Sequence, residues 1–309
     1  MKWKKVLPFI GVALFIYILI KLDISKIFEE IKNVNLSYLG LSLIFVGFLL
    51  VTQTLKWFVI ARNQKINIPF LESFKINIIS NFYGFITPAK IGSLIRAKYL
   101  RKYTDNIWKG ISNFTLDKVL DIISVLFIAI IFLFIFKEKF PGLPIGFFGI
   151  IFILLILAMF IFLKKERSKF ILRFFYNKIV PKKMKKKAKL TFNSFYEDLP
   201  KKRYFILFFI INLLSWINVY VVSFFIGKAL GINLSFVYFL TILPKGTLVS
   251  LIPITINGLG TREATLIGLF ALFGISAEKV FSLSMLSIVL SSIFPAIIAI
   301  FLIFKKKIN

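Results

Sequence analysis

The sequence predicts an all-α, polytopic membrane protein with about six full spans and two re-entrant broken-helix hairpins, about eight hydrophobic segments in all. Of its 309 residues, 59% are hydrophobic, and the mean hydropathy is +0.88. Apolar runs near the ~20 residues that cross a bilayer recur from end to end. The runs are continuous rather than alternating, which favours helices over the strands of a membrane barrel.

The charge is strongly basic, with 41 Lys and Arg against 13 Asp and Glu, a net charge of +28. The basic residues cluster beside apolar segments, which indicates membrane topology and contact with an anionic membrane surface rather than nucleic acid. The chain has no Cys and no His. Disulfides, thiol nucleophiles, imidazole bases and His- or Cys-ligated metals are therefore excluded, and we expect no cofactor and no metal.

Six segments have the length and composition of full spans: Val6–Ile20, Leu36–Ile60, Ile111–Phe136, Ile145–Leu163, Tyr204–Ile226 and Val280–Phe304. The first is slightly short and resembles a signal peptide, but no small-residue cleavage site follows, so we interpret it as a retained span. After it, apolar residues recur at helical spacing in Asp23–Asn35. This segment is either an amphipathic helix in the membrane interface or a surface helix packed on the spans.

Two segments, Phe70–Lys102 and Phe236–Gly274, are interrupted by proline and are expected to be re-entrant. In the first, Phe70–Ile86 is too polar for an ordinary span, and the basic stretch Lys90–Lys102 follows it. A full crossing would place that basic stretch outside, against the positive-inside tendency. A hairpin that enters and returns on one side removes the conflict. Two pairs of short full spans are the competing interpretation.

These assignments place both termini in the cytoplasm of a cell-membrane protein that forms one transmembrane domain, residues 1–309. The first hairpin then opens to the cytoplasm and the second to the outside. The order span, span, hairpin, span occurs in residues 1–136 and, inverted, in residues 145–304, which a short loop joins. This is an inverted-topology repeat. Lys164–Arg203 has fifteen basic and three acidic residues and is predicted to be a cytoplasmic segment within the second half.

Each hairpin contains a break that suits the start of a helix. Thr87 is a plausible N-cap with Pro88 at the first helical position, and Thr261 is a plausible N-cap after Gly258 and Gly260. A helix N-terminus presents unpaired N–H groups and partial positive charge, so a nearby cation completes an anion site. Such breaks in corresponding halves of a membrane protein indicate a binding site at the repeat interface.

The motifs at these breaks resemble the transmembrane region of lysylphosphatidylglycerol synthases and similar stand-alone, flippase-like membrane proteins. The resemblance rests on P-x-x-x-G-x-x-x-R in Pro88–Arg96, on Leu116–Asp121, and on G-L-G-T-R-E within Pro253–Glu263. The resemblance covers nearly the whole chain, and it does not extend to the family's soluble aminoacyl-transfer domain. It therefore implies the lipid-translocating half rather than the synthase. The chain departs from the family pattern at Ser93, where Glu is common, and at Asp117-Lys118, where Glu-Arg is common.

Arg96 and Arg262 are the leading candidates to hold a phosphate, because a guanidinium pairs with it through two hydrogen bonds. Arg96 could instead mark the cytoplasmic interface. Glu263 points away from its neighbour Arg262 on a helix, so we expect it to pair elsewhere, with Arg96 or Lys118. The full candidate substrate-binding set is Pro88, Gly92, Arg96, Asp117, Lys118, Asp121, Gly258, Gly260, Arg262 and Glu263.

Asp117 and Asp121 share one helix face at spacing i, i+4. They could bind a metal, relay protons, or neutralise Lys90 or Arg96. Lys245 lies in an apolar run, as a further cavity cation or as a side chain that extends to the interface.

The function predicted from the sequence is a non-enzymatic transporter of an anionic phospholipid or a polyprenyl-phosphate-linked headgroup through a central cavity. One alternative is an integral-membrane enzyme that acts on a lipid phosphate, although the chain has no DxD motif and no nucleophile with an adjacent base. Another is a membrane scaffold on which Lys164–Arg203 docks a soluble glycosyltransferase.

Overall fold

A computed structural model of the chain describes residues 3–87, 90–104, 106–135, 203–252, 255 and 258–308, with isolated positions between 146 and 201. The described part is helical and contains no strand, which confirms the predicted all-α class. Its elements are α1 (Trp3–Lys21), α2 (Ile24–Lys32), α3 (Leu36–Asn63), α4 (Phe70–Phe85), η1 (Ile91–Leu94), α5 (Ile95–Leu100), η2 (Arg101–Tyr103), α6 (Ile107–Ile135), α10 (Tyr204–Ala229), α11 (Phe236–Leu251), α12 (Thr261–Ala271), α13 (Ala277–Ile288), the π-helical turn η5 (Val289–Ile293) and α14 (Phe294–Ile308).

Four of these helical stretches are long and apolar enough to cross a membrane: Leu36–Asn63, Ile107–Ile135, Tyr204–Ala229 and Ala277–Phe304. Each coincides with a predicted span. The first predicted span is also helical, as α1. Within it, Val12–Lys21 forms an apolar helical stretch that is shorter than the four spans above. Most of the predicted span Ile145–Leu163 and of the basic segment Lys164–Arg203 lies outside the described residues.

The amphipathic segment forms α2, which packs on α13. Ile27 is buried there, and Glu30 and Lys279 form an ion pair of 3.4 Å. Ile24 and Phe28 remain exposed, at 53% and 69%. The helix is therefore packed on the spans, as one interpretation of the sequence expected, and it keeps a partly exposed apolar side.

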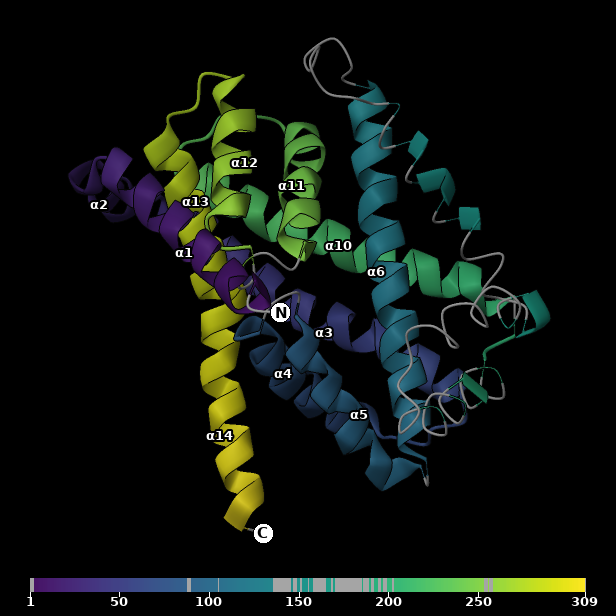
Figure 1. The fold of residues 1–309 in the computed structure, drawn as a ribbon. Helices are drawn as coiled ribbons and strands as arrows, with labels where there is room; N and C mark the ends of the chain where they lie inside the picture. Colours follow the sequence, from purple (N-terminus) through teal and green to yellow (C-terminus); the bar gives the residue numbers. More distant parts are fainter. Residues whose placement is uncertain are drawn as a thin grey trace.

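The centre of the fold is the pair α3 and α10, which pack along each other (Figure 1). In the same view α4 and α5 lie below this pair, whereas α11 and α12 lie above it. Packing between the two halves is reciprocal: α4 of the first half contacts α14, the last helix of the second, and α11 contacts α6, the last described helix of the first. Helices α4 and α11, one from each broken segment, therefore each pack on a helix from the opposite half.

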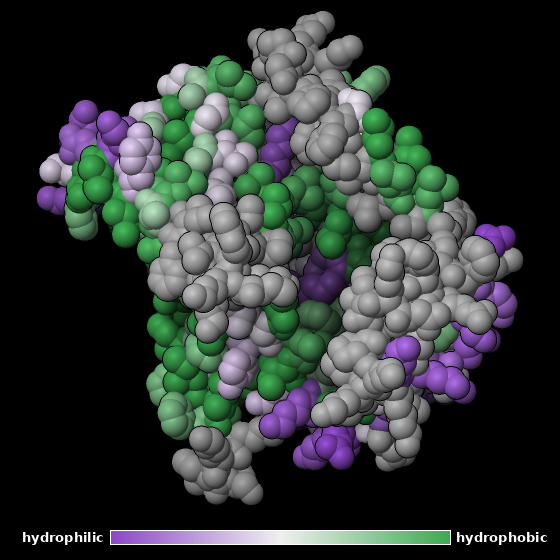
Figure 2. All heavy atoms as spheres, in the orientation of Figure 1, coloured by the Kyte–Doolittle hydropathy of each residue, from purple (hydrophilic) through white to green (hydrophobic). Residues whose placement is uncertain are grey.

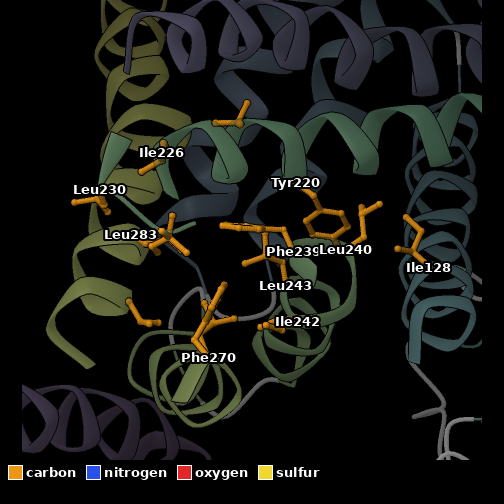
Figure 3. Packing of buried hydrophobic residues seen from close by; sticks show 14 of the residues in the cluster. Ile128, Tyr220, Ile226, Leu230, Phe239, Leu240, Ile242, Leu243, Phe270 and Leu283 are labelled. Atoms are coloured by element: carbon orange, nitrogen blue, oxygen red, sulfur yellow. The ribbon is translucent and has the colours of Figure 1, made fainter. Parts of the chain in front are cut away.

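The largest hydrophobic core joins α10, α11, α12 and α13 with α3 and α6. Figure 3 shows side chains of α10, α11 and α12, among them Tyr220, Phe239 and Phe270, pointing toward one another. The rings of Phe239 and Phe270 meet edge to face, with centroids 5.5 Å apart. This packing fixes α11 and α12 against α10 and so positions the second helix break.

Candidate functional site

A cavity of about 140 Å³ lies where the two helix breaks approach the central helices. A cavity of this size has room for several water molecules, since roughly 10–15 Å³ of such space is enough for one. Figure 2 shows the molecule hollowed near its middle, with hydrophilic side chains deep in the hollow. The cavity is lined from α3, the turn before η1, α10, α11, α12, α13 and η5 by Leu49, Gln53, Lys90, Trp216, Val219, Tyr220, Ser223, Leu243, Thr247, Ser250, Arg262, Leu266, Ser287, Ile288, Ser291 and Ser292.

The first break is built differently from the predicted cap. Lys90, in the left-handed region at φ 56°, directly precedes η1, so the cap position lies three residues beyond Thr87. The Thr87 hydroxyl still accepts a hydrogen bond from the Gly92 N–H, at 2.7 Å, and donates to the Tyr83 carbonyl at 2.9 Å. A Cβ on Gly92 would lie 2.1 Å from that carbonyl oxygen, so only glycine fits. Pro88 lies outside the described residues.

The second break depends on glycine for backbone shape. Gly258 and Gly260 have φ of +79° and +82°, a region that side chains disfavour. A Cβ on Gly258 would also lie 2.3 Å from Cβ of Ser250 on α11. The cap position is Gly260 rather than the predicted Thr261, which is the first residue of α12 and whose hydroxyl donates to the Gly258 carbonyl at 3.1 Å. The glycines therefore shape the turn and let it lie directly on α11.

The carboxylate of Glu263 caps this helix and forms no ion pair with any described residue. Its Oε2 accepts from the Gly260 N–H at 2.6 Å, and its Oε1 accepts from the Ser284 hydroxyl at 2.7 Å. The side chain is buried, with 1% of the residue exposed. The expected pairing with Arg96 or Lys118 was wrong, because the unpaired N–H at the start of α12 is closer and satisfies the carboxylate locally.

The two breaks each deliver one cation to the cavity. Lys90 reaches it from the turn before η1, and Arg262 reaches it from the first turn of α12. Neither side chain has an ion-pair partner within 4.0 Å among the described residues. The Arg262 stem passes Gly246 of α11, whose ideal Cβ would lie 3.6 Å from the arginine Cγ. The cavity therefore concentrates positive charge that the described chain does not neutralise by direct contact.

An ion cluster lies beside the cavity and consists of the buried residues Lys56, Arg96, Asp117 and Asp121 and the partly exposed Lys118. Arg96 Nη2 lies 3.0 Å from Asp117 Oδ2, and Lys56 Nζ lies 3.2 Å from Asp117 Oδ1. Lys56 also contacts Asp121, and Lys118 Nζ lies 2.9 Å from Asp121 Oδ2. Three cations thus share two carboxylates and join α3, α5 and α6. Asp117 neutralises Arg96, which was one of the predicted roles, whereas Asp121 pairs with Lys56 and Lys118 instead.

Arg96 belongs to this cluster and does not line the cavity. Only 4% of the residue is exposed, and its guanidinium lies over the rings of Trp57 and Phe114, at 4.8 and 5.5 Å. Of the two arginines predicted to hold a phosphate, the structure brings only Arg262 to the cavity, while Lys90 occupies the place expected for Arg96. Arg96 turns away because Asp117 and two aromatic faces offer it a buried, paired environment.

Sequence reasoning missed the central role of Lys56. Its position amid the apolar residues of α3 was the available signal, because a lysine there needs a partner. Lys245 is likewise buried, at 4% exposure, and donates to the Thr241 carbonyl. It is not among the residues that line the cavity, so the structure supports neither predicted role for it.

The fold and the cavity define a multi-pass α-helical membrane protein with a polar, cationic centre. The family model for the lysylphosphatidylglycerol synthase transmembrane region matches residues 6–299, and the chain belongs to that family. It is similar to the UPF0104 membrane protein PH1989 of Pyrococcus horikoshii, with 22% identity across 98% of this chain and 97% of that protein. A UPF0104 membrane protein of Methanothermobacter thermautotrophicus is 32% identical over 35% of this chain and 31% of its own length.

Proposed function

We propose that this protein carries anionic, phosphate-bearing lipid headgroups across the membrane through the cavity between its two helix breaks. The observation that carries the proposal is the convergence of Lys90 and Arg262, from opposite halves of the chain, on one cavity. The lipid tails would stay in the bilayer while the headgroup passes through the polar interior. The family's name adds a lipid context to this reading of the site.

The cations of the cavity and those of the ion cluster differ in whether a carboxylate pairs with them. A cation at the centre of a bilayer costs about 2.5–3.5 kcal/mol on insertion scales, so chains pair or hydrate such groups. This chain pairs Lys56 and Arg96 directly with carboxylates. It leaves Lys90 and Arg262 facing open space instead. Arg262 also lies in the first turn of the 11-residue helix α12, where the helix dipole favours an anion.

The two hairpins support transport through a re-entrant, inverted repeat. Helices α4 and α11 have 16 residues each, a length of about 24 Å at 1.5 Å per residue, which is short of a ~30 Å hydrocarbon core. They lie on opposite sides of the α3–α10 pair (Figure 1), and each packs on a helix of the other half. We propose that the first opens to the cytoplasm and the second to the outside of the cell membrane, with both termini in the cytoplasm.

We propose no catalytic step. The cavity lining offers serine and threonine hydroxyls, but no carboxylate or imidazole among the lining residues lies ready to act as their base. Two cations, hydroxyls and apolar walls suit binding and release of an anion. Contact of the basic segment with an anionic membrane surface, or with a glycosyltransferase, is compatible with this function and is a separate proposal.

Transport is testable in proteoliposomes that contain lipids labelled on an acyl chain, with an impermeant reagent that quenches label in the outer leaflet. Wild-type protein should make the inner-leaflet label accessible. Lys90→Ala and Arg262→Ala should slow this strongly, whereas Lys98→Ala, which removes an exposed lysine outside the cavity, should not. Equal rates for all three variants and the wild type would overturn the proposal, as would wild-type rates equal to those of protein-free vesicles.

A further inference from the structure

We propose that the cavity selects a headgroup that is anionic and hydroxylated, and that it excludes headgroups bearing an ammonium. This inference rests on the proposed function, because it names the substrate class of the same cavity. Three features of the lining carry it: its uncompensated cations, the orientation of most of its hydroxyl protons, and two serines in a π-helical turn.

The charges of the lining are all positive. Among the described residues of the lining, Lys90 and Arg262 are the charged ones, and none is a carboxylate. The lining residue Trp216 contacts a carboxylate behind the wall, because its indole N–H donates to Asp121 at 3.1 Å. That carboxylate is already shared with Lys56 and with Lys118. An ammonium group in the cavity would therefore meet two like charges and no available anion, which disfavours it.

Four hydroxyl groups of the lining donate their protons to backbone carbonyls and not to the cavity. Ser223, Thr247, Ser250 and Ser287 each donate to a carbonyl of their own helix, at 3.3, 3.1, 2.7 and 2.7 Å. The oxygens of the three serines keep lone pairs that can only accept, whereas the Thr247 oxygen already accepts from the Tyr220 hydroxyl at 3.5 Å. A matching ligand must therefore supply donors of its own. Because the cations disfavour ammonium donors, the donors that fit are hydroxyl groups.

Ser291 and Ser292 complete this set. Both line the cavity from the π-helical turn η5, a distortion that often accompanies functional sites. Serines in apolar helices commonly donate to the carbonyl one turn earlier, as Ser287 does. Neither Ser291 nor Ser292 hydrogen-bonds to a described residue through its side chain. The oxygens of these two hydroxyls are thus free to accept from a ligand hydroxyl.

The assignment is testable with four short-chain lipids that share a phosphodiester and differ beyond it. Phosphatidylglycerol is anionic with two hydroxyls, and phosphatidylethanol is anionic with none. Phosphatidylethanolamine carries an ammonium, and lysyl-phosphatidylglycerol adds two ammonium groups to the glycerol headgroup. Binding to the full chain in detergent is measured for each by thermal stabilisation during titration. We expect phosphatidylglycerol to bind at least about tenfold more tightly than either ammonium-bearing lipid, and several-fold more tightly than phosphatidylethanol.

The double variant Ser291→Ala/Ser292→Ala tests the hydroxyl contacts. It should weaken binding of phosphatidylglycerol by about tenfold and leave phosphatidylethanol nearly unchanged, since only the first lipid has donors for these oxygens. Ser282→Ala is the matched control: Ser282 lies in α13, is buried, has an unpartnered hydroxyl, and is absent from the lining. It should retain the preference of the wild type.

Equal or tighter binding of the ammonium-bearing lipids would overturn the inference, and so would a double variant that keeps the full preference for phosphatidylglycerol. The result is separable from the proposed function, because binding is measured without transport. Selective binding with no lipid movement in vesicles would sink the transport proposal and keep the headgroup assignment. Movement of all four lipids at one rate, with no binding preference, would keep the transport proposal and overturn the headgroup assignment.

Discussion

The indole N–H of Trp216 donates a hydrogen bond of 3.1 Å to Oδ1 of Asp121. Trp216 also lines the cavity, so this one side chain joins the cavity wall to the ion cluster. The cationic cavity and the ion cluster are therefore neighbours that share Trp216. Substitutions in the cavity should change ligand binding, whereas substitutions in the cluster should change folding.

Arg262 is expected to act on the ligand and not on the fold. Arg262→Lys keeps the charge but loses the planar fork, so lipid transport should fall partly, and Arg262→Ala should nearly abolish it. Neither change leaves a described carboxylate unpaired, so thermal stability in detergent should stay close to that of the wild type. Loss of activity that only parallels loss of folded protein would contradict this expectation.

Arg96 is expected to act on the fold. Arg96→Met removes a buried partner of Asp117, and breaking such a pair typically costs about 3–5 kcal/mol. The melting temperature should drop markedly, and Asp117→Asn in the same chain should restore part of it by removing the uncompensated charge. An unchanged melting temperature with lost lipid binding would instead make Arg96 a ligand contact.

Glu263 should be energetically independent of Arg262. Glu263→Ala leaves the Gly260 N–H and the Ser284 hydroxyl without their acceptor, at a cost of about 1–3 kcal/mol. In the double variant with Arg262→Ala the two changes in unfolding free energy should add. A clear rescue in denaturation measurements would reveal an ion pair between them that the hydrogen bonds described above do not include.

Gly92 is expected to tolerate no side chain. In Gly92→Ala the new Cβ would press on the Tyr83 carbonyl, so the first break must shift, and we expect destabilisation of about 1–3 kcal/mol or more. Gly47→Ala is the control, because nothing lies within 4 Å of its ideal Cβ. Similar yields and melting temperatures for both variants would show that the carbonyl contact is unimportant.

The proposed topology can be tested with single cysteines, since the natural chain has none. Lys98→Cys and Ser276→Cys place exposed thiols at the two ends proposed to lie inside and outside. An impermeant thiol reagent added to intact cells should label the cysteine at position 276 and spare that at position 98 until the cells are opened. External labelling at position 98 would refute the re-entrant first hairpin.

The helices and the breaks could be predicted because their signals are local. Apolar length marks the spans, and glycine and proline mark the interruptions, so Arg262 could be placed at a helix start from its neighbours alone. The predicted caps at Thr87 and Thr261 were displaced because a cap position depends on backbone angles, such as the left-handed Lys90, that sequence patterns constrain only loosely.

The partners of the charged residues could not be predicted in the same way. Lys56 meets Asp121 across 65 positions of sequence, and Arg96 meets Asp117 across 21. Such contacts depend on which helix faces meet after folding, and several cations near the aspartates had equal claim beforehand. Lys90 was undervalued for the same reason, since only the packed structure brings its turn to the cavity that Arg262 reaches from the other half.

The packing of α4 on α14 sets a constraint on biosynthesis. Ile78 of α4 is buried in a small cluster with Leu50 and with Ala299 of α14. A ribosome makes the chain from its N-terminus, so α4 is in place long before the helix that covers it has been made. The face of α4 that carries Ile78 therefore gains its contact with Ala299 only after α14, the last helix, has been made.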